Sequence, residues 1–459
     1  MGSFEPNGAL RALLSETGWS PRQLADEVNK VGTERRTPTT YKRQSVVHWL
    51  NGHVPMEENR PLIREAFARK LDRSITYADL GMAPPKDDSP NGSMDTLEGL
   101  ADLARSDMDP SRRSVVNTAL FSSALGIPKL EDLADRVSAI RSGRTNQIGQ
   151  PEVELVKDAI QRFSDLDYRQ GGRHTRPQAA AFIVNTVVPF LRANAPEAVR
   201  KAMLSAASDL CYLTGYMAVD EGIHGMGQRY YLKALELAGE AEDRSMYVVT
   251  LCAMSSQAVN LGHGAPALRL ADSAIPVSAQ ESPNIRAHLT VQKAYAAAAT
   301  GDVSGAHSLL SNAEALMARA QPEEKAVVGH FGPSTLARYE AQVHYSLGKV
   351  RESVRSMQES VTLRSGSHTT HTRSELLDTA RLAERQCEMG HLEGACATWN
   401  KVLDSYKLVH SGRCDDRITE MLRMLKPYAR NHHARALWER AREEVPSRIR
   451  TARNRAARA

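Results

Sequence analysis

The 459-residue chain is too long for one ordinary domain, so we expect about two or three compact units, or one small domain and a long repeat array. Hydrophobic residues make up 41% of the chain and charged residues 25%, as in soluble globular proteins, whereas aromatic residues reach only 5%, which favours closely packed helices. The net charge of +5 permits nucleic-acid binding without requiring it, so the position of the charge must decide.

Several classes of protein are disfavoured by missing patterns. The five cysteines show no C-x-x-C spacing, which argues against a disulfide framework or a zinc site and fits a reducing cytosol. No stretch of 18 apolar residues occurs, so no membrane segment is predicted. Nucleotide-binding glycine loops, nucleophile elbows and metal-ligand spacings are also missing, and we therefore expect no enzymatic activity, no cofactor and no metal ion.

The chain opens with two predicted amphipathic helices. Residues 7–18, NGALRALLSETG, repeat leucines at helical spacing and end at Gly18, a helix terminator. Residues 20–28, SPRQLADEV, place Ser20 at the N-cap and Gln23 three positions later, which is the pattern of a capping box. The start of the second helix is therefore defined by its own residues.

A turn rich in helix breakers follows, and then a third short helix. Gly32 and Pro38 predict the turn, and Thr39 or Thr40 would cap a helix that begins near Tyr41.

The third helix has two dissimilar faces. Val46, Trp49 and Leu50 share one face, which predicts that they are buried, whereas Gln44 and His48 point the opposite way. Residues 56–81 then predict one or two further short helices facing the same core.

The five predicted short helices resemble the lambda-repressor-like helix-turn-helix domain of the XRE class. The resemblance rests on LRALLSETGWSPRQLADEV in the first two helices and on RQSVVHWLNGHVP in the third helix and its exit. In that family the third helix enters the major groove and the second crosses the phosphate backbone. The resemblance implies that the base-reading residues are Arg43, Gln44, Ser45 and His48. It implies phosphate contacts from Ser20, Arg22, Gln23, Arg35, Arg36, Thr39, Thr40, Lys42 and Asn51.

The local charge supports a DNA-facing surface. Residues 30–48 contain one acidic residue, Glu34, against Lys30, Arg35, Arg36, Lys42 and Arg43. Such a surface is where phosphates are expected to lie. The alternative is that these charges form a solvated face and that the small domain mediates protein contacts only.

Composition divides the chain into four predicted segments. Residues 1–82 form the helix-turn-helix domain, and residues 83–150 form a linker that begins with APPKDDSPNGS and continues as connecting helices. Residues 151–446 form a helical repeat domain, and residues 447–459 form a basic tail that is expected to be disordered.

The repeat is carried by small residues. Gly262, Gly301, Gly348 and Gly390 each separate two helical patterns, and mostly small residues stand five and twelve positions later. A degenerate copy would begin at Asn431 and place Ala436 on the packed face, and residues 220–238 resemble a divergent earlier copy.

Small residues two turns apart let a partner helix approach closely. This pattern resembles the tetratricopeptide repeat, which implies an all-α fold ending in an α-solenoid. The alternative is an irregular helical bundle. The concave face of such an array binds peptides or proteins, and its candidate residues lie on the first helix of each pair: Gln257, Asn260, Gln292, Tyr295, Tyr339 and Gln342.

The order of the two regions resembles actinobacterial and peptide-responsive transcription regulators. The resemblance implies a cytoplasmic, sequence-specific regulator that binds double-stranded DNA and is nucleoid-associated when bound. We expect a homodimer or larger homo-oligomer, because one recognition helix covers too few bases for high affinity. A peptide or protein effector is also expected. The rival interpretations are a protein-interaction scaffold with a DNA-inactive helix-turn-helix and an enzyme with an unrecognised site in the array.

Overall fold

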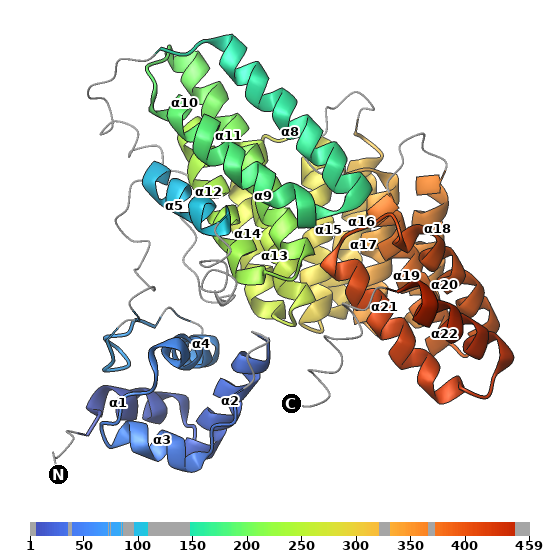
Figure 1. Ribbon diagram of the computed structural model, residues 1–459, viewed down its shortest axis with the longest axis horizontal. Helices are drawn as coiled ribbons and strands as arrows, with labels where there is room; N and C mark the ends of the chain where they lie inside the picture. The colour runs from blue at the N-terminus through green and yellow to red at the C-terminus, as the bar shows by residue number, and fades with distance from the viewer. Residues whose placement is uncertain are drawn as a thin grey trace. The chain divides into compact units, whose positions relative to one another are not determined.

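The computed structural model describes residues 6–34, 39–83 except 72 and 74, 85, 96–108, 147–320, 331–365 and 372–445. Within these ranges the chain is all-α, as predicted, apart from turns and an isolated bridge between Gln147 and Asn194 (Figure 1). Across the same ranges, none of the helices combines the length and the hydropathy that a bilayer span requires. The predicted basic tail, residues 447–459, lies outside the described residues.

The chain divides into two compact units, each described here by itself. The smaller unit contains the described residues up to Gly99, and the larger one contains Leu100–Met108 and residues 147–445. Helix α5 (Thr96–Met108) therefore begins in the smaller unit and ends in the larger one. Its Asp107 forms an ion pair with Arg176 and accepts a hydrogen bond from Tyr230 at 3.2 Å, so the larger unit includes part of the predicted connecting segment.

The smaller unit packs short amphipathic helices around one apolar core. Its elements are α1 (Gly8–Thr17), α2 (Pro21–Glu34), α3 (Arg43–Leu50), the 3-10 helix η1 (Glu57–Asn59) and α4 (Arg60–Leu71). Side chains that are fully buried in this core include Leu10, Leu24, Val28, Val46, Ile63 and Phe67. Each comes from the apolar face of its helix, so the hydrophobic periodicity accounts for the arrangement.

Two local predictions in the smaller unit were wrong. Helix α2 continues through Gly32, which is buried, and extends to Glu34, so Gly32 does not lie in a turn. Helix α3 begins at Arg43, and neither threonine of the preceding turn caps it. Tertiary packing accounts for the first difference, because a glycine inside a helix costs only about 1 kcal/mol and burial of one helix face can offset that.

The larger unit is a succession of antiparallel helix pairs preceded by four segments (Figure 1). The preceding segments are α8 (Gln150–Gln170), α9 (Gly172–Phe182), the π-helix η3 (Ile183–Val187) and α10 (Val188–Arg192). The pairs are α11 (Glu197–Asp220) with α12 (His224–Ala241), α13 (Arg244–Asn260) with α14 (Gly264–Ser278), α15 (Pro283–Ala299) with α16 (Val303–Met317), α17 (Pro333–Ser346) with α18 (Val350–Ser365), α19 (Thr372–Glu388) with α20 (Leu392–Tyr406), and α21 (Gly412–Leu425) with α22 (His432–Glu444).

Glycines in the left-handed region join the helices of most pairs. The four aligned glycines have φ between +74° and +85°, and Gly222 between α11 and α12 has φ +78°. The residues five and twelve positions later are buried at every one of these joints, among them Ala267, Ala274, Ser353 and Ser360. The small residues therefore lie where the two helices of a pair make contact.

The last pair follows a different pattern. Ala436, predicted to pack against the partner helix, is exposed, and α22 instead buries Ala434, Leu437 and Ala441. The joint between α21 and α22 is a 3-10 turn, η4 (Lys426–Tyr428), without a glycine. The spacing counted from Asn431 therefore does not identify the buried face of α22.

Candidate functional site

The surface of α3 presents polar side chains because its other face is anchored in the core. Val46, Trp49 and Leu50 are buried, and the Trp49 ring meets the edge of Tyr41 with 4.8 Å between ring centroids. Arg43, Gln44 and His48 are exposed on this short helix. The arrangement predicted for these residues is therefore the one found.

Ser45 lies differently from the other predicted base-reading residues. It is half-buried, and its hydroxyl accepts a hydrogen bond from the backbone N–H of Lys42 at 3.3 Å. This bond satisfies a backbone donor at the start of α3. Ser45 thus stabilises the beginning of the helix, and only the remaining capacity of its hydroxyl is open to a ligand.

The first turn of α2 supplies a second exposed edge. Ser20 and Gln23 form the predicted capping box: the N–H of Ser20 donates to Oε1 of Gln23 at 2.8 Å, and the N–H of Gln23 donates to Oγ of Ser20 at 3.3 Å. Arg22 is exposed between them. A helix N-terminus with an adjacent cation is a suitable position for a phosphate group.

Asn29 holds the turn between α2 and α3 and was missed by the sequence analysis. Its side-chain amide donates to the carbonyl of Tyr41 at 2.9 Å, and its Oδ1 accepts from the N–H of Tyr41 at 2.8 Å and from the Thr39 hydroxyl at 2.9 Å. An asparagine in the last turns of a helix, before a polar loop, is the available sequence signal. The hydrogen bonds of the Asn29 side chain fix where α3 begins.

The remaining predicted phosphate contacts fall into three groups. Thr40 and Lys42 are exposed beside α3. Asn51 is exposed but accepts a hydrogen bond from Arg11 at 3.1 Å. Arg35 and Arg36 lie outside the described residues.

Part of the predicted cationic surface is neutralised within the unit. Lys30 forms an ion pair with Glu27 of the same helix. Glu34 lies 2.8 Å from the guanidinium group of Arg69 on α4, so it does not cancel the neighbouring cations of α3. The described cations at the α3 surface are therefore Lys42 and Arg43, with Arg22 at the start of α2.

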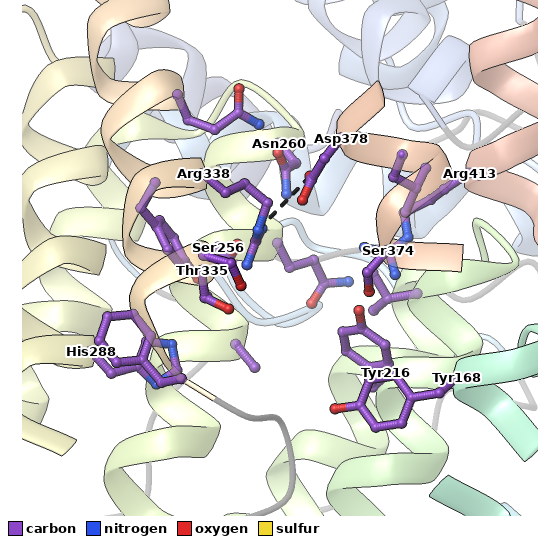
Figure 2. A pocket seen from close by; sticks show the side chains of 18 of the residues that line it. Tyr168, Tyr216, Ser256, Asn260, His288, Thr335, Arg338, Ser374, Asp378 and Arg413 are labelled. Carbon is purple, nitrogen blue, oxygen red and sulfur yellow. Dashed lines mark ion pairs between the residues drawn. The ribbon is translucent and has the colours of Figure 1, made fainter. Parts of the chain in front are cut away.

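The larger unit contains an inner pocket of about 360 Å³ (Figure 2). Its walls come mainly from α8 and from the first helices of successive pairs, α11, α13, α15, α17 and α19. Five of the six predicted groove residues line it: Gln257, Asn260, Tyr295, Tyr339 and Gln342. Gln292 does not, since it is fully buried and donates to the Ser255 hydroxyl at 2.9 Å.

Aromatic side chains form much of the pocket wall. The lining includes six of the chain's 13 tyrosines, Tyr168, Tyr212, Tyr216, Tyr231, Tyr295 and Tyr339. His288 stacks on Phe331 with 4.7 Å between ring centroids. Burial and the positive charge of Arg338 lower the pKa of His288 to about 4, so this imidazole is neutral at physiological pH and adds no charge to the wall.

Three arginines and one aspartate form what we call the arginine cluster: Arg338, Arg364, Arg381 and Asp378. The Asp378 carboxylate, 1% exposed, lies 4.0 Å from Arg338, 3.2 Å from Arg364 and 3.7 Å from Arg381. All four residues line the pocket, and Figure 2 shows the Arg338–Asp378 pair on its wall. No local pattern in the sequence predicts this cluster, because its arginines lie on three different helices and meet only in the folded unit.

A second charged network includes two residues that line the pocket, Asp167 and Arg413. Arg373 of α19 is fully buried and lies 2.5 Å from Asp167 of α8 and 3.7 Å from Asp220 of α11. Arg413 of α21 lies 2.9 Å from Asp220, which also accepts from the Ser411 hydroxyl at 2.8 Å. Two cations thus meet two carboxylates.

The charge state of this network follows from its geometry. Burial by itself would raise the pKa of Asp220, but the guanidinium groups of Arg373 and Arg413 outweigh burial and hold that pKa below its ordinary value. The Asp220 carboxylate therefore remains ionised, whereas burial raises the pKa of Asp167 despite its contact with Arg373. The network connects the first helices of the larger unit with the last ones.

Comparison with known proteins adds one finding. A family model described as the SP15 N-terminal domain matches residues 10–83, the stretch that contains most of α1, all of α2 to α4 and the turn that follows. The match does not extend into the larger unit. No curated protein matches the chain.

Proposed function

We propose that the protein is a sequence-specific DNA-binding transcription regulator. The observation that carries the proposal is the surface of α3, where Arg43, Gln44 and His48 are exposed while the opposite face is locked into the core. Gln44 can bind adenine and Arg43 guanine through paired hydrogen bonds in the major groove, each worth about 1–3 kcal/mol of discrimination. Rigid anchoring of the helix favours such geometry.

Phosphate contacts would come from the start of α2 and from the turn before α3. Arg22 stands in the first turn of α2, where backbone N–H groups and the helix dipole attract anions. Thr40 and Lys42 lie beside the reading surface. These groups carry no base preference, so their part is to position α3 in the groove.

The helical array would carry self-association and receive a signal. Because a single short helix reads few bases, specific binding calls for two copies on paired half-sites separated by about one helical turn of DNA or a multiple of it. The competing interpretation is a scaffold whose small domain contacts proteins instead of DNA. The regulator and the scaffold are distinguished by how strongly salt weakens retention on DNA.

The first test uses fragments selected from a randomised DNA pool. Gln44→Ala should remove the preference for the selected site, about a 10- to 100-fold loss of discrimination, while leaving affinity for random DNA and the helical content unchanged. Arg22→Ala should weaken selected and random DNA alike and flatten the salt dependence. Fluorescence anisotropy at about 50 and 200 mM salt measures both effects.

The matched control is Gln358→Ala, the same substitution at an exposed position of α18. It should leave DNA binding unchanged. Selective binding that persists in Gln44→Ala would refute the base-reading assignment. Selection that enriches no sequence, together with retention that salt does not weaken, would favour the scaffold.

A further inference from the structure

The arginine cluster carries more positive charge than its own carboxylate can neutralise. Three guanidinium groups surround Asp378, and each is paired with that carboxylate alone among the described residues. Buried charges are costly unless they are paired. Two positive charges at the wall of the pocket therefore favour an anion inside it.

The positive charge of Arg381 is likewise only partly offset by Asp378. Burial lowers the pKa of Arg381, and although Asp378 opposes this, repulsion from Arg417 and Arg338 adds to it. Its side chain is only 19% exposed, so water stabilises the charge poorly. A bound anion would offset both the burial and the repulsion.

Three residues that line the same pocket hold buried polar atoms without a hydrogen-bond partner in the described chain: Gln257, Arg364 and Arg413. Gln257 is 2% exposed, and its Nε2 donates to the His224 carbonyl at 2.8 Å, but its buried Oε1 has no hydrogen-bond partner among the described residues. Nε of Arg364 and one Nη of Arg413 are likewise buried and unpartnered within the described chain. A ligand with both acceptor and donor groups would satisfy these atoms.

The rest of the wall indicates the body of the ligand. Six tyrosines line the pocket, and aromatic faces favour planar, apolar groups. A volume of about 360 Å³ is at the lower end of the range for small-molecule sites, roughly 300–1,000 Å³. One small molecule would fill the space, whereas a long peptide would not.

We propose that the inner pocket binds a small organic anion, whose planar ring contacts the tyrosines and whose carboxylate or phosphate group contacts the arginine cluster. The inference that the pocket binds such a ligand does not depend on the proposed function. The further consequence, that the ligand changes DNA affinity, rests on the proposed function. Arg373 and Arg413 are each already held by a buried carboxyl group, Asp167 and Asp220, which leaves the arginine cluster as the place for the anionic group.

The experiment titrates the full chain, without DNA, by calorimetry with three related probes. Naphthyl phosphate and naphthoate represent the two possible anionic groups, and naphthamide is their neutral analogue. At least one anion should bind about 10- to 100-fold more tightly than naphthamide, because hydrogen bonds to charged groups are stronger than neutral ones. Which anion binds more tightly identifies the preferred group.

Arg338→Gln is the decisive variant. It removes one guanidinium group and leaves Asp378 paired with Arg364 and Arg381, so the unit should remain folded, which its melting temperature verifies. Anion affinity should fall about tenfold while naphthamide affinity stays unchanged. Arg381→Gln, interpreted in the same way, replaces it if Arg338→Gln unfolds. Arg351→Gln, at an exposed position of α18, is the matched control.

Two results would refute the proposed anion-binding site. In the first, neither anion binds to the wild type; in the second, the anions and naphthamide bind to it equally tightly. Naphthamide affinity falling in step with anion affinity in Arg338→Gln would also contradict the assigned contact. A final arm measures DNA affinity with and without the tighter anion. If the anion binds but DNA affinity does not change, the site stands and its role as an effector site is refuted. This failure is distinct from failure of DNA binding itself.

Discussion

At the scale of single residues, the larger unit contains carboxyl groups that folding keeps from ionising normally. Asp209 of α11 is the clearest case: burial, with the nearby negative charge of Asp243 in addition, raises its pKa to about 7. Its Oδ1 is buried without a hydrogen-bond partner in the described chain. The protonated form is therefore favoured in the folded protein below about pH 7, far above the range of an ordinary aspartate.

Asp209→Asn should stabilise the protein more at high pH than at low pH. The folded pKa lies above the ordinary value, so the folded chain holds the proton longer and stability falls as the pH rises from about 4 to 7. Asparagine has no proton to lose and avoids this fall. The gain in unfolding free energy over wild type should be about 2–3 kcal/mol larger at pH 8 than at pH 5, because each pH unit between the ordinary and the folded pKa costs the wild type about 1.4 kcal/mol.

Urea denaturation at the two pH values measures the difference. Asp158→Asn, at an exposed position of α8, is the control and should show no comparable pH dependence. An Asp209→Asn effect that is equal at both pH values would show that the carboxyl group ionises normally in the folded protein.

At the scale of elements, the close approach of α11 and α12 depends on missing side chains. A Cβ atom at Gly227 would lie 2.6 Å from Cγ2 of Val219 and 3.0 Å from the carbonyl oxygen of Gly215 on the facing helix. No real Cβ atom occupies such positions without movement of its neighbours. The glycine at this position therefore sets the distance between the two helices.

Gly227→Ala should destabilise the larger unit by about 1–3 kcal/mol, because the added methyl group forces the two helices apart. Gly394→Ala makes the same change in α20, where a Cβ would meet nothing within 4 Å. There the better helix propensity of alanine should leave stability unchanged or raise it by up to about 1 kcal/mol. Thermal unfolding of both variants measures the contrast, and equal effects would disprove the packing explanation.

At the scale of the whole molecule, the larger unit is more closely connected than a simple open array. In an open solenoid each repeat contacts only its neighbours. Here Arg373 of α19 reaches Asp167 of α8, 206 residues earlier, and the N–H of His410 donates to the carbonyl of Gln170 at 2.6 Å. These contacts join α8 to α19 and to the segment before α21, beside the inner pocket that Asp167 lines.

Arg373→Ala should lower the unfolding free energy of the larger unit by about 3–5 kcal/mol, because it leaves Asp167 and Asp220 buried without their shared cation. Arg423→Ala removes an arginine from a solvent-exposed pair with Glu420 and should lower stability far less, because water and salt screen such pairs. Chemical denaturation compares them. A loss in Arg373→Ala no larger than in the control would mean that the network does not hold the unit closed.

Features that depend on neighbouring residues were predictable from the sequence. The Ser20–Gln23 capping box, the termination of α1 at Gly18 and the buried face of α3 follow from helix periodicity and local hydrogen bonds. The glycine joints and the small residues after them were found by counting along the chain, because each helix pair repeats the same contact. The all-α fold follows from these local signals.

Only the tertiary structure decided where distant side chains meet. Most of the groove residues were predicted from their place on first helices, but nothing local indicates that Arg338, Arg364 and Arg381 surround one carboxylate. Periodicity determines which face of a helix is buried against its partner. The meeting of faces from different pairs depends instead on the small rotation between successive pairs, which accumulates over the array. That accumulated rotation placed the arginine cluster at the pocket and Arg373 beside Asp167.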